Sequence, residues 1–423
     1  MNIAIFTDIF LEVPGGICSS IMAQKAGLEA LGHKVTIFCP GWSRPKDKSI
    51  VIIPTMSRHL KINGAPVSHA PEKVIAWVNA NYPMLNQFDI IHVHYEASCS
   101  LAGIKLARQF HIPLVQTMHG REDVAIQTNV PPPIKYLVAT TLNDLHSPDL
   151  PHPINIKKDH NLAPTHTRAK MWTLMVNHAN AADAVITPSY HFAKKLQEYG
   201  VKRKITRVSN AIDDAVASAE DWPVRSFSPG QPLKLFWNSR VSHEKRIMVF
   251  LEAINLATKK SATLKVTICG DGNAEKEAKE YVSKNHLQKI VKFEGRVSHA
   301  TMLNRMKEQH LSVLTSYGFD IQPMTLLEAE AVGLPVLICD PDMREVTAPS
   351  GTVFCPKPDA STIATTLYNL SQTPSKITEL SKAMLAHRKE VLISTQVAKM
   401  LEVYQSLLRH HPSINSNKKP HIH

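Results

Sequence analysis

Charged residues that could hold a phosphorylated ligand lie at two predicted strand-to-helix turns in the second half of the chain. Arg240 and Lys245 are five positions apart in one turn, and Asp320 and Glu328 are eight positions apart around another. Ligands of open α/β sheets bind beyond the carboxyl ends of the strands, where such turns lie. Two cations beside a helix N-terminus suit a diphosphate, because the helix end favours negative charge and Arg can grip two oxygens. Carboxylates accept hydrogen bonds from ribose and sugar hydroxyls.

Each of these pairs also fits a plainer interpretation. Surface ion pairs explain the two cations equally well, and a solvated loop acid with a surface Glu on an amphipathic helix explains the carboxylates. Two carboxylates that flank one bond are also typical of a glycosidase. The cations and the repeated two-domain pattern favour a nucleotide diphosphate carrying a sugar over a glycosidase substrate.

A glycine pair and two histidines are the corresponding features of the first half. Gly15 and Gly16 separate a strand expected at residues 2–7 from a helix that ends near residue 31. This order lets backbone N–H groups approach a phosphate, but the GxGxxG fingerprint is absent, and a tight turn that needs glycine explains the pair equally well. His94 and His119 end two expected strands. We expect them to line a polar site without a metal, because no third ligand has metal spacing.

Strands alternate with helices through both halves, which predicts an α/β fold with two Rossmann-like, doubly wound parallel sheets. A chain of 423 residues with 43% hydrophobic residues is long enough for two cores. We expect a first domain at residues 1–210, a linker at 211–231 and a second domain at 232–393. A helix at 394–411 is expected to pack back on the first domain, and a polar tail at 412–423 is expected to be disordered.

Positive charge is concentrated in one part of the first domain. The net charge is +12, and residues 151–210 contain ten Lys or Arg against three Asp or Glu, a local excess of +7. Such a surface fits an anionic membrane or serves solubility, and no stacking-aromatic pattern indicates a nucleic-acid partner. Prolines between residues 123 and 170 predict an irregular, mobile loop. Apolar residues between 157 and 175 suit an interfacial helix, unless they pack inward.

The remaining features predict a cytoplasmic protein. The start, MNIAIFTDIF, lacks the regions of a signal peptide, and no apolar run approaches the ~20 residues of a membrane span. Six scattered cysteines without CxxC spacing are typical of buried thiols in a reducing compartment. Any membrane contact is therefore expected to be peripheral, on the inner face of the membrane.

Ten stretches of the sequence, in chain order, resemble the landmarks of the retaining glycosyltransferases of family 4. They are IAIFTDIFLEVPGGI, EALGHKVTIFCPG, FDIIHVHYEASCSLAGIKLA, QTMHG, ANAADAVITPSYHFAKKL, VSNAID, SRVSHEKR, ICGDGNAEKEAK, EGRVSH and DIQPMTLLEAEAVGLPVL. The last is similar to the family's E-x7-E signature, with Asp320 in the place of the first Glu. Ser239 and Ala211 stand where glycines are usual. The resemblance spans roughly residues 1–410 and implies the GT-B architecture of two facing Rossmann-like domains.

The resemblance assigns roles to individual residues. It implies that Arg240 and Lys245 hold the donor diphosphate, that Glu328 binds the ribose, and that Asp320 and His119 lie near the donor sugar. The backbone near Arg296 would meet the base, and Gly16 would approach the phosphates. The implied donor-binding residues are Gly15, Gly16, Arg240, Lys245, Arg296, Val297, Asp320, Gln322 and Glu328, and the implied catalytic residues are His119, Arg240, Lys245 and Asp320.

The implied reaction moves a hexose-type sugar from a nucleotide-diphosphate sugar, expected to be a UDP-sugar, with retention at the anomeric carbon. The departing diphosphate would itself take the acceptor proton, so we expect neither an enzymic base nor a metal cofactor. Asp340 and Asp342 imitate a DxD metal motif but are expected in an ordinary loop. The run TMHGRED at residues 117–123 is similar to glycolipid-forming members, which implies a lipid acceptor. The alternatives are a soluble glycan or protein acceptor, and a non-catalytic protein that binds sugar nucleotides.

Overall fold

A computed structural model describes residues 1–12, 15–42, 45–57, 61–62, 65–82, 85–218 and 222–410. Two compact units make up the chain. The first contains Met1–Ser209 and the chain from Gln396 onward, and the second contains Asn210–Thr395. The expected tail at 412–423 lies outside the described residues, as do Val13 and Pro14 before the glycine pair.

Seven parallel strands form the main sheet of the first unit, in the order β3-β2-β1-β6-β7-β8-β9. The strand order changes direction between β1 and β6, and such a switch point is where α/β sheets bind ligands. The strands are β1 (Asn2–Thr7), β2 (Lys34–Cys39), β3 (Ile50–Ile52), β6 (Ile90–His94), β7 (Leu114–Thr117), β8 (Ala184–Thr187) and β9 (Ile205–Arg207), with a separate antiparallel pair β4 (Lys61–Ile62) and β5 (Ala65–Pro66).

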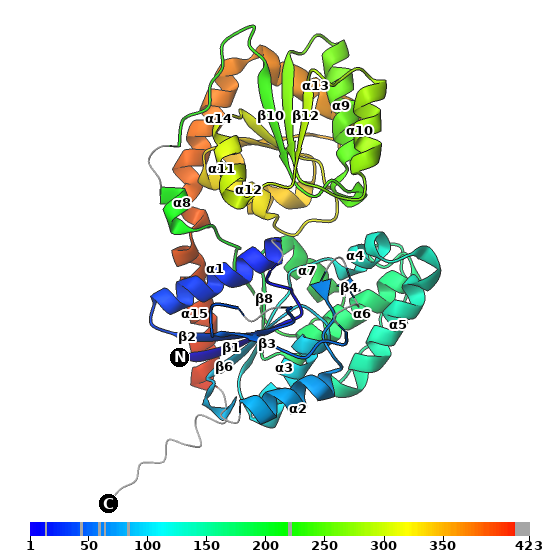
Figure 1. The fold of residues 1–423 in the computed structure, drawn as a ribbon, viewed down its shortest axis with the longest axis vertical. Coiled ribbons are helices and arrows are strands. Elements are labelled where there is room, and N and C mark those ends of the chain that lie inside the picture. The colour runs from blue at the N-terminus through cyan, green and yellow to red at the C-terminus, as the bar shows by residue number, and fades with distance from the viewer. Residues whose placement is uncertain are drawn as a thin grey trace, which may run out of the picture. The chain divides into compact units, whose positions relative to one another are not determined.

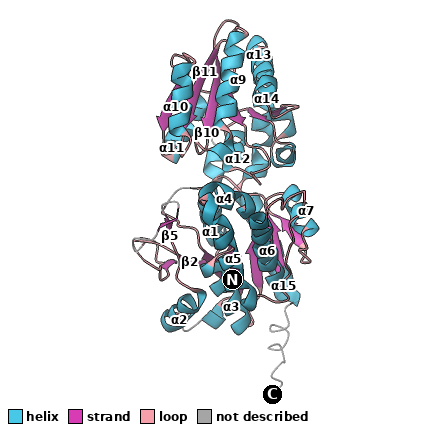
Figure 2. Ribbon diagram, turned by 90° about the vertical axis from the view of Figure 1, so that its right-hand side faces the viewer, coloured by secondary structure: helices cyan, strands magenta, loops and turns pink. Residues whose placement is uncertain are grey.

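Helices flank both faces of this sheet (Figure 1 and Figure 2). Their apolar sides cover strands that are buried almost throughout, as parallel strands usually are. The helices are α1 (Gly16–Ala30), α2 (Pro71–Asn81), α3 (Ser98–Gln109), α4 (Glu122–Asn129), α5 (Lys135–His146), α6 (His166–Ala181) and α7 (Tyr190–Glu198).

The second unit repeats this plan with six parallel strands in the order β12-β11-β10-β13-β14-β15. They are β10 (Leu233–Asn238), β11 (Leu264–Cys269), β12 (Val291–Gly295), β13 (Leu311–Leu314), β14 (Val336–Ile338) and β15 (Thr352–Phe354). The helices are α8 (Asp214–Ser218), α9 (Ile247–Lys259), α10 (Glu275–Lys284), α11 (His299–Lys307), α12 (Met324–Ala331), α13 (Ala360–Gln372) and α14 (Pro374–His387).

Two apolar cores lie on the two faces of this second sheet. One contains residues of α9, α10 and α13, and the other contains residues of α11, α12 and α14. Figure 1 shows these two groups of helices on opposite sides of the strands. The sheet is therefore fixed from both faces, and its loops at the carboxyl edge start from a rigid support.

The last helix, α15 (Ile393–His410), begins in the second unit, and its residues from Gln396 belong to the first. Tyr404 is fully buried, and its hydroxyl lies 2.7 Å from Nδ1 of His92 in β6. The other ring nitrogen of His92 lies 2.6 Å from the Thr117 hydroxyl of β7. This buried polar chain ties α15 to two central strands. His92 is therefore a structural histidine.

The predicted α/β class and the parallel sheets are confirmed, and nearly every predicted strand is present within a residue or two of its expected ends. All six cysteines are buried free thiols, as expected. The short strand β15, the pair β4–β5 and the helices α2, α4, α5 and α8 were not predicted. Among the described residues, no helix is long and apolar enough to cross a bilayer.

The prediction of an irregular loop over residues 123–170 was wrong for most of its first half. That region contains α4 and α5, and Pro132 and Pro133 form the 3₁₀ turn that leads into α5. Proline is tolerated in the first turn of a helix because the N–H it lacks has no partner there. The prolines therefore divide the region into short helices without preventing them.

The interfacial helix expected within residues 157–175 was also wrong. Helical structure begins only at His166, and Met171, Trp172 and Met175 of α6 are buried in the first unit. The indole N–H of Trp172 donates to the carbonyl of Leu162, and its ring stacks on Tyr199. These apolar residues pack inward, and the exposed lysines beside them are left on the surface.

A buried ion triad fixes the start of α4. Asp123 is fully buried and accepts hydrogen bonds from Arg121, at 2.7 and 2.9 Å, and from Arg168 of α6, at 2.9 Å. Arg121 is also buried, and its guanidinium lies over the ring of Trp172. Because each charge is paired, the segment that follows β7 is held firmly against α6.

Replacing Asp123 with Ala should leave two arginines without their partner. We expect a loss of about 3–5 kcal/mol in the free energy of unfolding, because an uncompensated buried charge is costly. Urea unfolding followed by circular dichroism measures this change. The control is Asp144→Ala, at an exposed position of α5, which should cost less than about 0.5 kcal/mol. Equal stabilities of the two variants would contradict the structural role of the triad.

Candidate functional site

The charged residues predicted in the second unit gather at the carboxyl edge of its sheet. Strands β10 and β13 are adjacent and parallel, with Leu235 opposite Leu311. The loop after β10 contains Arg240 and Lys245, and the loop after β13 contains Asp320. Glu328 follows in the second turn of α12. Strand adjacency therefore brings together residues that are about eighty positions apart in sequence.

Lys245 and Asp320 form the central contact. The ammonium nitrogen lies 2.5 Å from Oδ1 of Asp320, and the two side chains are only 11% and 9% exposed. The hydroxyl of Ser316 donates to the other oxygen of Asp320, and the ammonium also lies over the ring of Phe319. The pair presents a fixed cation beside a fixed carboxylate.

The loop that carries Lys245 is held by its neighbour Arg246. This residue has a left-handed backbone (φ 59°), and its guanidinium donates to the carbonyls of Thr315, at 3.2 Å, and Pro358, at 2.6 Å. The Thr315 hydroxyl donates in turn to the carbonyl of Lys245 at 3.0 Å. Arg246 is thus a structural cation that fixes the position of Lys245.

Two glycines after β11 allow close backbone packing against the same loop. A Cβ at Gly270 would lie 2.0 Å from the carbonyl oxygen of Ser239, and one at Gly272 would lie 2.3 Å from that of Val241. The N–H of Val241 donates to the carbonyl of Asp271 at 2.9 Å. The Gly270–Gly272 run therefore packs closely against the loop that contains Arg240 and Lys245. A side chain at either glycine would displace that loop.

Arg240 differs from Lys245 in its surroundings. Its side chain is 53% exposed, and its guanidinium approaches only to 3.7 Å from the Glu244 carboxylate. An ion pair this exposed contributes little to stability. Arg240 can therefore turn toward a ligand at small cost, which fits the phosphate-binding role expected of it.

Glu328 is buried and held from two sides. Its carboxylate accepts a hydrogen bond from the Asn238 amide at 3.1 Å and lies 3.1 Å from Nε2 of His299 in α11. The hydrogen bond to Glu328 raises the pKa of His299. The sequence offered no local sign of either neighbour, because they come from β10 and α11.

The structure gives less direct support for donor binding by Gln322, Arg296 and Val297 than the sequence led us to expect. Gln322 is buried, and its side-chain carbonyl accepts the Asn210 backbone N–H at 2.7 Å, so it closes a contact within the second unit. Arg296 follows β12 on the surface, and Val297 packs against the core beneath α11.

Asp340 caps a turn by accepting the N–H groups of Gly318 and Asp342, at 2.6 and 3.0 Å. Asp340 is the N-cap of a 3₁₀ helix, Pro341–Val346, that contains Asp342, where an ordinary loop was expected.

In the first unit, His94 is the last residue of β6, His119 lies two residues beyond the end of the neighbouring strand β7, and the two histidines form a pair. Nδ1 of His94 lies 2.7 Å from Nε2 of His119, and their rings stack. Burial lowers the pKa of His119 to about 3 and lowers that of His94 as well. Both rings are therefore neutral near physiological pH, and they can serve as hydrogen-bonding groups but not as cations.

Gly15 and Gly16 open α1 at the carboxyl end of β1. Gly15 has an extended backbone (φ −171°), so its conformation does not itself demand glycine. A Cβ built at Gly15 meets nothing within 4 Å, so the space beside it is open. An open helix N-terminus without a side chain fits the approach of a ligand better than it fits a strained tight turn.

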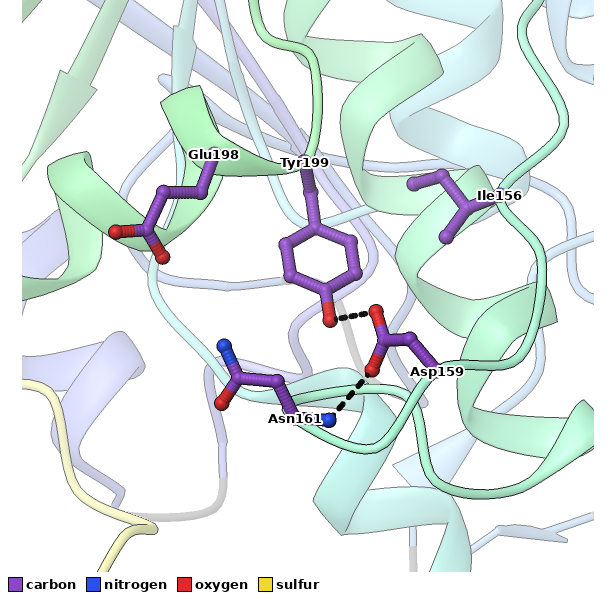
Figure 3. Close-up of a pocket in the computed structure, with 5 residues that line it drawn as sticks. All are labelled: Ile156, Asp159, Asn161, Glu198 and Tyr199. Atoms are coloured by element: carbon purple, nitrogen blue, oxygen red, sulfur yellow. Dashed lines mark hydrogen bonds between the residues drawn. The ribbon is translucent and has the colours of Figure 1, made fainter.

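No group of acidic, histidine or cysteine side chains within the described ranges is arranged to hold a metal ion. An open pocket of about 450 Å³ lies elsewhere in the first unit, lined by Ile156, Asp159, Asn161, Glu198 and Tyr199 (Figure 3). It adjoins the end of α7, a helix that starts at the carboxyl end of β8 and runs away from it. The pocket is therefore remote from the edge at which such sheets bind ligands.

Comparison with known proteins defines the class of this fold and site. The structure of HepE from Anabaena in complex with UDP superimposes with a TM-score of 0.66 at 16% identity, covering 96% of this chain and 100% of that one. The fold is accordingly that of the GT-B glycosyltransferases.

The family models agree with this class. The model described as Glycosyltransferase Family 4 matches residues 14–216, and the model described as Glycosyl transferases group 1 matches residues 218–384. The chain belongs to the family 4 glycosyltransferases.

Two relatives share the name alpha-monoglucosyldiacylglycerol synthase. The protein from Streptococcus pneumoniae is 26% identical over 363 residues, covering 80% of this chain and 70% of its own length. The protein from Acholeplasma laidlawii is 23% identical over 398 residues, covering 90% and 91%.

Removing either cation of the second unit should impair turnover. We expect Arg240→Ala and Lys245→Ala each to reduce it at least about tenfold, because losing one charge at a leaving diphosphate costs about 2–4 kcal/mol. Turnover of UDP-sugars measures this loss, and Lys276→Ala, on the exposed side of α10, is the matched control. Melting temperatures must accompany the Lys245 result, because that variant also leaves Asp320 without its partner. Normal turnover in both variants would remove the proposed donor site.

Proposed function

We propose that this glycosyltransferase moves a hexose from a UDP-sugar to a membrane lipid, with retention of the anomeric configuration. The observation that carries the proposal is the Lys245–Asp320 pair, with Arg240 and Glu328 at the same edge of the second sheet. The names of the two relatives, each a diacylglycerol glycosylating enzyme, support the lipid acceptor.

The donor is assigned to the second unit. Arg240 and Lys245 bind the diphosphate, and Glu328 accepts hydrogen bonds from the ribose hydroxyls. Asp320 lies near the sugar and keeps the ammonium of Lys245 in place. The base is assigned to the backbone at Arg296 and Val297. The UDP present in the HepE structure is consistent with this choice of nucleotide.

Catalysis in this proposal is chiefly the stabilisation of charge on the leaving group. As the bond between the sugar and the diphosphate breaks, its electron pair goes to the diphosphate, where two fixed cations lower the energy of the transition state. The acceptor oxygen attacks from the same face, and its proton passes to the departing diphosphate. Gly15 and Gly16 of the first unit are assigned to the phosphates and His119 to the sugar. No metal cofactor takes part.

The acceptor is assigned to the first unit, at the surface of a membrane. Lys157, Lys158, Lys202, Arg203 and Lys204 are all exposed on that unit. Basic groups near an anionic leaflet contribute about 1 kcal/mol each, so a few suffice for reversible binding. The attachment is peripheral and on the cytoplasmic face, where the sugar nucleotide is available.

Two other functions remain as alternatives, and simple measurements separate them. A transferase for soluble glycans or proteins would act without vesicles, and a non-catalytic protein would bind UDP-sugars without turning them over. A thermal-shift screen of UDP-, GDP- and ADP-sugars identifies the base, and product analysis then identifies the acceptor class.

The two acidic positions should have separable effects. We expect Glu328→Ala mainly to weaken the binding of UDP, because its partner is the ribose, and Asp320→Ala mainly to slow sugar transfer. Titration calorimetry with UDP alone, together with steady-state transfer, measures both. Loss of UDP affinity in Asp320→Ala but not in Glu328→Ala would reverse the assignment.

Vesicle flotation tests the membrane assignment. We expect the protein to float with phosphatidylglycerol vesicles at low salt and to remain behind with neutral phosphatidylcholine vesicles. The double variant Lys157→Gln/Lys158→Gln should bind about thirtyfold more weakly, since two charges that contribute about 1 kcal/mol each are lost. Lys276→Gln in the second unit is the control. Absence of binding to anionic vesicles at low salt would contradict a peripheral membrane protein.

A further inference from the structure

Three charged residues follow β7 in succession, and their contacts divide them into two groups. Arg121 and Asp123 are both used in the buried triad with Arg168. Glu122 takes no part in it: one of its oxygens accepts a hydrogen bond from the Tyr95 hydroxyl at 2.8 Å. The triad thus fixes the backbone on both sides of Glu122. The carboxyl group of Glu122 takes no part in the triad and is available to bind a ligand.

The carboxyl group of Glu122 lies beside the site histidine. A Cβ built on Gly120, the residue after His119, would sit only 2.6 Å from the second oxygen of Glu122. Tyr95, which holds the first oxygen, directly follows His94 at the end of β6. Glu122 therefore lies against the two residues, Tyr95 and Gly120, that directly follow His94 and His119.

A second acid at this edge has a vacant oxygen. Glu96 follows Tyr95 and is 4% exposed, and its Oε1 has no hydrogen-bond partner among the residues that the structure describes. Asp8, the nearby acid at the end of β1, is fully used: it accepts the N–H groups of Cys99, at 2.8 Å, and Ser100, at 3.0 Å, and the Ser68 hydroxyl, at 2.8 Å. A buried polar atom without a partner requires an explanation, and a bound ligand is one.

The electrostatics of the two acids suit a hydroxyl group. Burial raises the pKa of Glu122 to about 7, with a further contribution from the Asp123 carboxylate, while the Tyr95 hydrogen bond opposes it. Burial and the carboxylates of Glu122 and Asp8 raise the pKa of Glu96 well above its usual value. The raised pKa of Glu96 favours its protonated form, which can donate a hydrogen bond, and the carboxylate of Glu122 can accept one. A hydroxyl both donates and accepts, so it satisfies both groups.

We propose that Glu122 and Glu96 form the subsite for the acceptor hydroxyl, with Glu122 as the carboxylate that accepts its hydrogen bond and Tyr95 as the residue that positions Glu122. This inference rests on the proposed function, since it identifies where the acceptor of that reaction binds. Glu122 orients the hydroxyl and ends the reaction unchanged. The acceptor oxygen forms its bond to the sugar, the diphosphate leaves with the electron pair, and the acceptor proton goes to the diphosphate.

A pH dependence follows from the raised pKa of the Glu122 carboxyl group, which lies in the range where activity is measured. Around it, His94 and His119 have lowered pKa values, the pKa values of Tyr95, Glu96 and Asp8 are raised, and Asp123 is ion-paired with two arginines. Since the pKa of Glu122 is raised to about 7, its carboxylate forms as pH rises through that value. Acceptor use should rise over the same range.

Glucosyl transfer from UDP-glucose to dioleoylglycerol in phosphatidylglycerol vesicles tests the subsite. We expect Glu122→Gln to lower kcat/KM for dioleoylglycerol at least about tenfold and to abolish the rise through pH 7, because a carboxamide does not titrate. The affinity for UDP, measured by calorimetry, and the slow hydrolysis of UDP-glucose by water should stay within about twofold, as neither needs the acceptor. Glu252→Gln, exposed on α9, should behave as wild type.

Tyr95→Phe is the second variant and keeps the test decisive if Glu122→Gln folds poorly. Removing the hydroxyl takes away a hydrogen bond that lowers the pKa of Glu122, so the midpoint of the pH profile should move upward. Transfer by Glu122→Gln within about twofold of wild type, or an unchanged pH profile in both variants, would overturn the subsite. A wild-type protein that neither binds UDP nor turns over UDP-glucose would instead contradict the proposed function, and the subsite would fall with it.

Discussion

The ion pair between Lys245 and Asp320 is the contact around which the second unit is arranged. Two nearly buried charges are stable only when their geometry is good and further hydrogen bonds satisfy them. Here the adjacency of β10 and β13 provides the geometry, and Ser316 provides the additional hydrogen bond. Arg246 and the two glycines after β11 hold the cation loop in place. The short side chain of Asp320 is thus fully engaged with the ammonium, although the family resemblance leads one to expect a longer Glu there.

The first unit uses its charges in a different way. Its carboxyl edge is lined by neutral histidines and by acids with raised pKa values, so it offers hydrogen bonds with little fixed charge. This chemistry suits a hydroxyl-bearing acceptor, whereas the cations of the second unit suit a diphosphate. The buried triad of Arg121, Asp123 and Arg168 and the link from Tyr404 to His92 keep this edge rigid. In the proposed function, each unit therefore binds one of the two substrates of the transfer reaction.

Local sequence signals predicted most of the fold but only part of the site. Apolar runs bounded by turn residues located nearly every long strand, and Asp320 and Glu328 could be placed because each follows a clear strand or helix signal. Strand β15 was missed because three residues between a glycine and a proline-rich loop carry almost no periodic pattern. The inward packing of Trp172 could not be predicted, because a basic, partly apolar segment has the same composition whether it faces a membrane or a core.

The site residues that escaped prediction are those defined by tertiary contacts. His299 is paired with Glu328 across two elements, and Glu122 is distinguished from Arg121 and Asp123 only by where each side chain points. The sequence of residues 120–123, Gly-Arg-Glu-Asp, contains no signal that separates Asp123, the acid of the buried triad, from Glu122, the acid proposed to bind a ligand. Helix α5 was missed for a related reason, since prolines were read as breaking a helix that they in fact begin.

The anomeric configuration of the product tests the central claim most directly. Proton NMR of the glycolipid formed from UDP-glucose and dioleoylglycerol vesicles distinguishes the α- from the β-linked glucoside. Because UDP-glucose is α-linked, a retaining transferase that uses this donor yields the α-glucoside. A β-glucoside would contradict the front-face mechanism, and the absence of any glycolipid from a protein that still binds UDP would contradict the lipid acceptor.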